Sequence, residues 1–278
     1  MPPTQDARVL VTVKTYPSPS DKYGETVCVA GVRLDGVAPQ WVRLYPMGYR
    51  LVDYDQHFKK YDIIEIPLRA HGSVDPRPES MRPDQSKMAL IRNVGTERNW
   101  AERRSLIGGL IGATTTCELI AANKAVDYSH GAPSLALVGV RDVAIDVGDG
   151  EPWDARQLAK VTKAARPDLF NPEGLRELEP APFRVRVKYR CADDRCLGHQ
   201  PALIDWETGQ AGRRWLREVG PARAKDRLRR KYEELFGPDR DAHLYVGNLH
   251  QHRASFSALG VWTPKLEPPD PYDGDLFS

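Results

Sequence analysis

The 278-residue sequence has only four cysteines, four methionines and six phenylalanines, and it contains no long apolar run. Four unevenly placed cysteines are too few for a disulfide scaffold. Two of them, Cys28 and Cys117, lie within apolar runs, where a reduced cysteine behaves as a small core residue. No window approaches the roughly 18 apolar residues that a membrane span needs, and the start has no apolar signal segment. We therefore expect a cytoplasmic protein.

A strong net charge is also missing. Forty Lys and Arg residues face 38 Asp and Glu residues, which gives a formal charge of +2, so binding of a polyanion would have to rely on local clusters. The Gly-x-Ser-x-Gly, Gly-x4-Gly-Lys-Ser/Thr and Gly-x-Gly-x2-Gly signatures do not occur. The sequence therefore does not support the nucleophile turn of an α/β-hydrolase, a phosphate-binding P-loop or a dinucleotide-binding site.

The first half of the chain has the pattern of a β-rich unit, which we predict over residues 1–150. Runs rich in Val, Ile and aromatics are bounded by Pro, Gly or Asp, and two helical segments come before a last, continuously apolar run. We expect that last strand to close the N-terminal sheet. This layout resembles small RNA-binding barrels of the PUA or ASCH kind, and an OB-like barrel is the alternative. The strands are Val9–Tyr16, Thr26–Leu34, Trp41–Tyr45, Asp62–Leu68 and Leu135–Asp146, and the helices are Asn99–Ile111 and Thr115–Asn123.

The second half is predicted to be a smaller α+β unit with two basic helices, which makes the whole chain an α+β protein. Residues 151–182 contain a helix and a Pro-rich linker, residues 183–264 form the α+β domain, and residues 265–278 form a disordered acidic tail. The Asp-Leu-Phe at the end of the tail is a candidate contact for a protein partner. The expected strands are Phe183–Arg190, Ala202–Glu207, His243–Val246 and Phe256–Trp262, and the helices are Trp153–Arg166, Arg213–Val219 and Ala222–Phe236, the last two separated at Gly220–Pro221.

A candidate metal site lies between two of these strands. Cys191, Cys196 and His199 fall within nine residues, in the spacing Cys-x4-Cys-x2-His. Thiolate and imidazole are the ligands that Zn²⁺ prefers, and zinc needs four of them. We expect the fourth ligand to be His250 or His252, because residues at i and i+2 on a strand share a face. Two buried cysteines beside a capping histidine are the alternative.

Cationic residues are concentrated beside this site. Nine basic residues and only two acidic ones lie between Arg213 and Lys231, and the strand Phe183–Arg190 alternates apolar residues with cations. The planar guanidinium group of arginine can donate two hydrogen bonds to the oxygens of one phosphate. This pattern therefore predicts one surface that binds DNA or RNA. A solvated helix face is the alternative. The predicted phosphate contacts are Arg184, Arg186, Lys188, Arg213, Arg214, Arg217, Arg223, Arg227 and Arg230.

An aromatic and cationic run in the N-terminal unit is a second candidate for nucleic-acid contact. Trp41, Arg43 and Tyr45 alternate along one predicted strand, where rings could stack on bases while the guanidinium holds a phosphate. Ordinary core packing of the two aromatics is the alternative.

Two further functions are left open by the sequence. Asp205 and Glu207 share one face of the expected strand Ala202–Glu207, a spacing that could bind Mg²⁺ in a metal-dependent nuclease. The lysine expected two residues later is replaced by Gly209, so an ion pair with the neighbouring Arg run is the alternative. The third function is a protein-interaction module that uses the basic surface.

Overall fold

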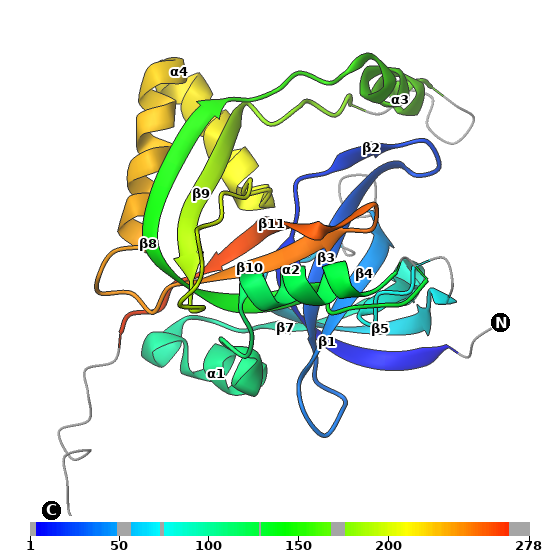
Figure 1. The fold of residues 1–278 in the computed structure, drawn as a ribbon. Helices are drawn as coiled ribbons and strands as arrows, with labels where there is room; N and C mark the ends of the chain where they lie inside the picture. Colours follow the sequence, from blue (N-terminus) through cyan, green and yellow to red (C-terminus); the bar gives the residue numbers. More distant parts are fainter. Residues whose placement is uncertain (1–3, 49–56, 73–74, 128, 168–175, 267–278) are drawn as a thin grey trace, which may run out of the picture.

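The computed structural model describes residues 4–48, 57–72, 75–127, 129–167 and 176–266 (Figure 1). Among these residues no helix has both the length and the apolar character needed to cross a membrane. Almost all of the acidic tail predicted for residues 265–278 lies outside the described part of the chain.

The N-terminal unit is a five-stranded β-barrel, as the strand pattern predicts. Its strands follow one another in the order β1, β3, β4, β6 and β5, and β5 pairs with β1 to close the barrel. The short β2 extends the edge of β3, and β7 pairs with β5. The strands are β1 (Gln5–Lys14), β2 (Ser18–Ser20), β3 (Gly24–Arg33), β4 (Gln40–Met47), β5 (Asp62–Ala70), β6 (Ser80–Pro83) and β7 (Ala89–Asn93). The short 3-10 helix η3 (Gln85–Lys87) lies between β6 and β7.

Alternate side chains along these strands point inward and fill the barrel. Branched residues such as Val9, Val29 and Ile64 are completely buried in its interior, where β-branched side chains pack well on a pleated surface. β1 and β3 approach so closely that a Cβ at Gly31 would lie 2.4 Å from the carbonyl oxygen of Leu10. Only glycine fits at that position.

The second unit is an antiparallel sheet in the order β11, β10, β8, β9, with helix α4 against it. The expectation that Leu135–Asp146 closes the N-terminal sheet is wrong, because this segment belongs to β8, which pairs with β10 and β9. The strands are β8 (Leu135–Asp149), β9 (Phe183–Cys191), β10 (His243–Leu249) and β11 (His252–Trp262).

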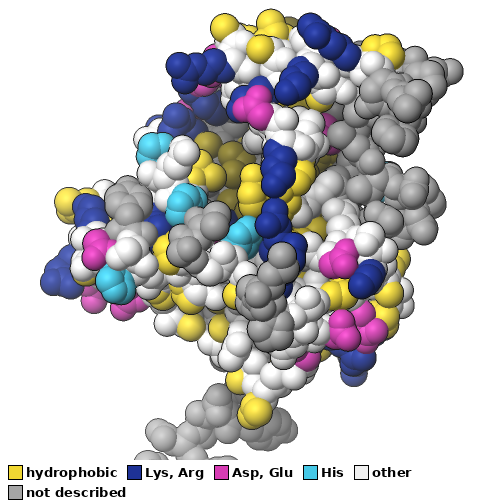
Figure 2. All heavy atoms as spheres, turned by 90° about the vertical axis from the view of Figure 1, so that its right-hand side faces the viewer, with side chains coloured by type: hydrophobic (Ala, Val, Ile, Leu, Met, Phe, Trp, Pro, Cys, Tyr) yellow, Lys and Arg dark blue, Asp and Glu magenta, His cyan; other side chains and the backbone are white. Residues whose placement is uncertain are grey.

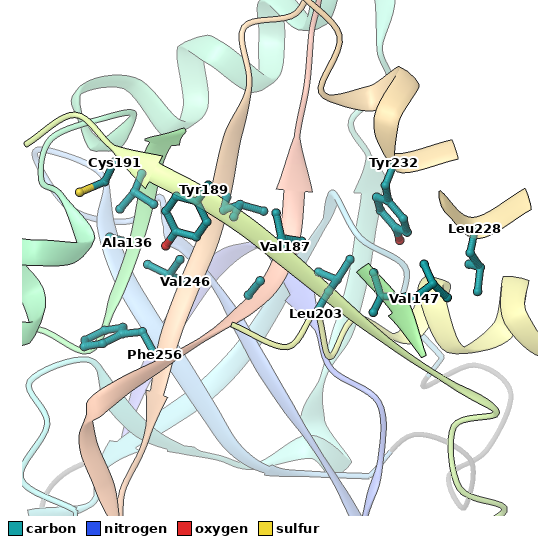
Figure 3. Packing of buried hydrophobic residues seen from close by; sticks show 14 of the residues in the cluster. Ala136, Val147, Val187, Tyr189, Cys191, Leu203, Leu228, Tyr232, Val246 and Phe256 are labelled. Carbon is teal, nitrogen blue, oxygen red and sulfur yellow. The ribbon is translucent and has the colours of Figure 1, made fainter. Parts of the chain in front are cut away.

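The expected burial of that strand on both faces is confirmed for residues 135–138 only, because Arg141, Asp142 and Asp146 are exposed. Leu135 and Leu137 point towards the barrel and share a cluster with residues such as Trp262, while Ala136 and Val138 face the cluster under α4. Figure 3 shows that second cluster, in which side chains from β8, β9 and β10 meet the helix. A strand that is apolar on both faces can lie between two layers. Its apolar content therefore does not indicate which of the two sheets it belongs to.

The helices lie near their predicted positions. α3 begins at a capping box in which the Asp154 carboxylate accepts from the Gln157 backbone N–H. α4 is broken at Gly220, whose φ of 77° is not helical, and the break at Gly220–Pro221 is thus confirmed. The helices are α1 (Glu97–Ile107), η4 (Gly108–Leu110), α2 (Thr116–Ala125), α3 (Ala155–Ala165) and α4 (Trp206–Leu235).

One expected strand is wrong. In Ala202–Glu207 only isolated bridges form, and α4 begins at Trp206 with Asp205 as its N-cap. The run is apolar but short, and periodicity cannot separate such a run from the lead-in to a helix.

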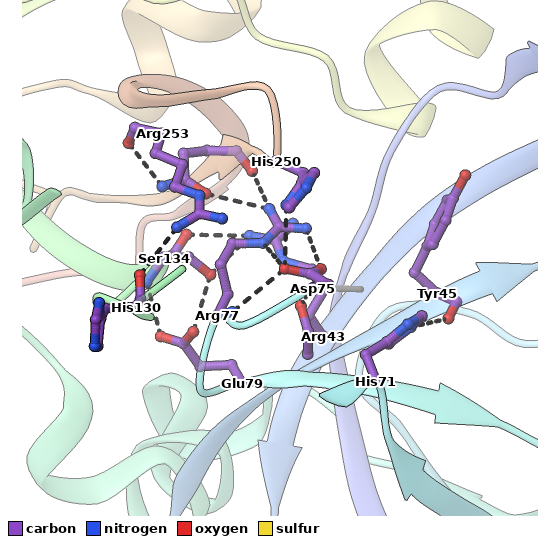
Figure 4. A network of polar contacts seen from close by, with 12 residues as sticks. Arg43, Tyr45, His71, Asp75, Arg77, Glu79, His130, Ser134, His250 and Arg253 are labelled. Carbon is purple, nitrogen blue, oxygen red and sulfur yellow. Dashed lines mark hydrogen bonds and ion pairs between the residues drawn. The ribbon is translucent and has the colours of Figure 1, made fainter. Parts of the chain in front are cut away.

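A buried polar network fastens the barrel to the second sheet (Figure 4). The Arg43 guanidinium of β4 donates to the carbonyl and hydroxyl of Ser134, just before β8, at 3.1 and 3.2 Å. Arg77 donates to the Asn248 carbonyl of β10 at 2.9 Å and is held by a bidentate pair with Asp75. Because all of these side chains are buried, the two units form one body with a polar seam.

Candidate metal centre and adjoining cleft

Four side chains converge at the end of β9. The donor atoms of Cys117, Cys191, Cys196 and His199 all lie within 4.8 Å of one another. The Cys117 Sγ lies 3.6 Å from the Cys191 Sγ and 3.5 Å from the His199 Nε2. In a tetrahedral zinc site with ordinary bond lengths, two sulfurs lie about 3.8 Å apart and a sulfur and a nitrogen about 3.6 Å apart. The group therefore has the composition and the size to hold a metal such as zinc.

Local structure places each of the four donors. Cys191 is the last residue of β9, and the Cys196 carbonyl accepts from the Arg190 Nε, which folds the loop back on the strand. Gly198, with φ of 106°, turns the chain so that the backbone of His199 pairs with that of Tyr189. Cys117 comes from the first turn of α2, which is fixed by a capping box between Thr115 and Glu118.

The electrostatics of the group suit a cation. Burial and the neighbouring thiols raise the pKa of Cys117 to about 12, so three thiolates at this spacing require a positive charge between them. Burial lowers the pKa of His199, which favours the neutral imidazole that metals bind. The helix N-terminus beside Cys117 adds a partial positive charge that favours the thiolate.

The structure brings together the three ligands predicted from the loop and corrects the fourth. Cys117, which was expected in the core, is the fourth donor in place of the expected histidine. His250 lies elsewhere, with its Nδ1 3.4 Å from an Asp75 oxygen, and His252 starts β11 on the surface. The capping box before Cys117 is visible in the sequence, but nothing in the spacing points from it to a loop 74 residues away.

A row of cations runs along β9 from the metal group. Arg184, Arg186, Lys188 and Arg190 alternate with buried residues, and three of the four are exposed while Arg186 is half-buried. The clean period of two predicted for this strand is confirmed. We name these four side chains the β9 row. Asp146 of the neighbouring β8 is paired in register with Arg186, and Glu151, just after β8, forms an ion pair with Arg184 at 2.8 Å.

The cations of α4 do not join the β9 row. Val185 and Val187 of β9 pack in one cluster with Leu228 and Tyr232 of α4, so the helix covers the face of the sheet opposite the row. The expectation of one continuous basic surface is therefore wrong.

Many of the α4 cations are also paired within the chain. The Arg213 guanidinium bonds the Glu179 carboxylate and donates to the Glu179 and Pro180 carbonyl oxygens at 2.9 Å. Arg214 and Arg227 lie 3.8 and 3.2 Å from the carboxylate of Glu218. Arg217, Arg223 and Arg230 are exposed on the same helix.

The other end of the β9 row opens into a cleft of about 820 Å³ between the two units. Figure 2 shows this face, with hydrophobic side chains deep in a hollow and Lys, Arg and His side chains gathered around it. The barrel contributes residues 15–18, which follow β1, and residues of β3 and β4, and the second unit contributes β9 and the segments that lead to and from α3. Arg184 and Arg186 of the β9 row lie in its wall.

The aromatic and cationic run of β4 divides between the core and this cleft. Trp41 is half-buried and packs edge-on against Tyr245, so it serves the core. Arg43 and Tyr45 line the cleft, together with His71, whose Nε2 donates to the Tyr45 carbonyl at 2.8 Å. Figure 4 shows the Tyr45 ring directed away from the polar network.

Two family models match separate parts of the chain. One, described as a domain of unknown function (DUF8757), matches residues 112–277, which is more than half of the chain. The chain belongs to the DUF8757 family. The second, also described as a domain of unknown function (DUF8758), matches residues 5–109 and so spans the barrel. No curated protein matches the chain.

In this DUF8757 chain, Asp205 and Glu207 have a different environment from the one expected. They stand at the start of α4, and the Lys60 ammonium lies between them, 2.5 Å from Asp205 and 2.6 Å from Glu207. Their cationic partner comes from the barrel and not from the neighbouring Arg run. A divalent ion bound by both carboxylates would have to displace a buried lysine whose pKa is raised by the same two acids.

Proposed function

We propose that this DUF8757 chain is a zinc-stabilised nucleic-acid-binding protein that contacts its ligand through the β9 row and the adjoining cleft. The observation that carries the proposal is the course of the row: it starts at the metal group and ends in a cleft with aromatic walls. The metal group thus anchors the strand that presents the cations.

The metal is assigned to zinc and to a structural role. Three thiolates and one imidazole are typical of Zn²⁺, and a set of four protein ligands leaves no open position for a substrate. Bound to Cys117 and to the β9 loop, the ion would tie α2 to the end of β9. It would thereby fix Arg190 and the start of the row, because the Arg190 Nε already bonds the Cys196 carbonyl.

The β9 row suits a polyanion because its cations stand at regular intervals on a rigid strand. Alternate residues of a strand are about 6.7 Å apart, which is close to the distance between successive phosphates of an extended polynucleotide. Lys188 and Arg190 are exposed and their side chains have no carboxylate within 4.0 Å among the described residues. They can therefore release counterions from a phosphate backbone on binding.

Salt-dependent fluorescence polarisation with labelled oligonucleotides tests the proposal. Replacing Arg186 and Lys188 by Gln should weaken binding and, for a single strand, reduce the magnitude of the slope of log K against log salt by about 1.4. The matched control replaces Arg217 and Arg223 of α4 by Gln, which removes the same charge from the opposite face of the sheet. This control should bind like the unmodified protein.

Two outcomes would contradict the proposal. Binding that weakens with the α4 pair and not with the β9 pair would place the interface on the helix. Absence of salt-sensitive binding to any DNA or RNA, with retained binding of an acidic protein, would favour an interaction module.

A further inference from the structure

We infer that the ligand is single-stranded and that the cleft holds one or two unpaired bases. This inference deepens the proposed function and rests on it. It concerns what the cleft recognises, whereas the proposed function concerns where the backbone runs.

The cleft has aromatic walls whose polar tips are already in use. The Tyr16 hydroxyl donates to the Glu179 carbonyl at 2.8 Å, and the Trp153 Nε1 donates to the Leu178 carbonyl at 2.7 Å. Both residues line the cleft, as does Tyr45, which is 39% exposed. Because the ring edges of Tyr16 and Trp153 are held by the protein and the Tyr16 ring stacks on Trp206, contacts with a ligand would be made mainly by apolar surface and by the rings of Trp153 and Tyr45. A nucleobase is a ligand that matches such surfaces.

The cleft is enclosed in a way that suits an unpaired base. The barrel bounds one side, and residues 150–153 and 180–181, which lead to and from α3, bound the other. α3 packs on β2 and β3, and the Lys160 Nζ lies 2.9 Å from an Asp21 oxygen, so these connections are held against the barrel. In a duplex the faces of each base are covered by its neighbours, and only the base edges are accessible in the grooves. Stacking in an enclosed cleft therefore requires bases that are free of a partner strand.

A buried cation at the cleft adds selectivity for an anionic ligand. Arg43 is 3% exposed, and no carboxylate lies within 4.0 Å of its guanidinium among the described residues. Its Nη1 lies 3.1 Å from the Cys28 Sγ, and its Nε is buried with no hydrogen-bond partner in the described chain. The hydrogen bonds to Ser134 satisfy the guanidinium but do not neutralise its charge, so the positive potential that Arg43 adds at the cleft favours an anionic phosphate.

Five oligonucleotide probes of equal length distinguish the modes of binding. They are single-stranded DNA, single-stranded RNA, the DNA duplex, the RNA duplex and an abasic DNA strand with the same number of phosphates. We expect at least one of the two single strands to bind at least tenfold more tightly than its duplex. The abasic strand should be weaker than single-stranded DNA by about 5- to 150-fold for each base held, which is 1–3 kcal/mol of stacking converted to affinity.

Substitutions at Tyr45 test whether the contribution of the bases to binding depends on the cleft. Tyr45→Leu keeps an apolar side chain without a ring and should weaken binding of the single strands by about 5- to 150-fold, the loss of one stacked base. Tyr45→Phe keeps the ring and should bind like the unmodified protein. Equal melting temperatures of the two variants would confirm that the fold is intact.

The outcomes separate this inference from the proposed function. If neither single strand binds more tightly than its duplex, or if a protein that prefers single-stranded DNA to its duplex binds the abasic strand equally tightly, the inference is overturned while the β9 row remains the interface. An unchanged affinity of Tyr45→Leu would also overturn it. If no probe binds, the proposed function fails and the inference fails with it.

Discussion

Replacing Cys117 by Ala tests the metal centre most directly, because the residue is the only one of the four donors that comes from outside the loop at the end of β9. The substitution removes one donor and cuts the link between α2 and β9. We expect the purified variant to lose near-stoichiometric zinc, while the unmodified protein contains about one ion per chain. Cys28→Ala is the matched control, since Cys28 is also half-buried and lies outside the group.

The size of the effect on stability follows from the link. Cys117 and Cys191 are 74 residues apart in the sequence, and the chain-entropy relation for a crosslink that closes a loop of this length gives about 4 kcal/mol. The ion also links Cys191, Cys196 and His199 to one another, so this value covers only the link between α2 and β9. For a unit of this size it corresponds to a fall in melting temperature of about 10 °C.

Thermal unfolding with and without a chelator measures this loss. The chelator should destabilise the unmodified protein and Cys28→Ala to a similar extent, and it should leave Cys117→Ala nearly unchanged because that variant has already lost the ion. Full zinc content in Cys117→Ala would refute the assignment of the fourth ligand. A melting temperature of the zinc-loaded protein that does not respond to metal removal would refute the structural role.

Three further results are expected. His250→Gln and His252→Gln should keep full zinc content by elemental analysis; loss of zinc in either would restore the histidine as a ligand. Asp146→Asn, which removes the exposed carboxylate in register with Arg186, should strengthen oligonucleotide binding by about two- to fivefold because it removes a negative charge beside the row, and weaker binding would argue against the row. Burial lowers the pKa of Lys14 from 10.5 to about 8, so stability should rise with pH between these values, where the unfolded chain keeps a proton that the folded chain has released. Lys14→Met should therefore stabilise the protein below pH 8 by up to about 3 kcal/mol, a gain that fades towards pH 10.5 in denaturant titrations; a gain independent of pH would contradict this account.

Local patterns in the sequence predicted local structure well. The alternation in Phe183–Arg190 correctly predicted which side chains of β9 are buried, because alternate residues of a strand lie on the same face. The Cys-x4-Cys-x2-His spacing identified three of the four donors, because a tight loop brings its own residues together. The barrel likewise followed from short strands bounded by turn residues.

Features that depend on contacts distant in sequence were not predictable in the same way. Cys117 was expected in the core, and only the position of the start of α2 beside the end of β9 brings its thiol to the loop. Likewise, no pattern connects Lys60 to Asp205 and Glu207, which lie on the other unit. The basic residues of α4 indicated one surface with β9, but burial of Leu228 and Tyr232 turns the helix to the opposite face.

The seam formed by Arg43, Ser134, Arg77 and Asn248 has a consequence for the two sequence families that meet between residues 109 and 112. A barrel produced alone would exchange the Ser134 and Asn248 acceptors of the two guanidinium groups for water, and it would expose apolar residues such as Leu10 and Tyr61 that pack against Leu137 and Trp262 of the second unit. The other fragment would lose the donors for Ser134 and Asn248 and half of the cleft wall. Neither fragment should therefore be stable or bind ligand by itself.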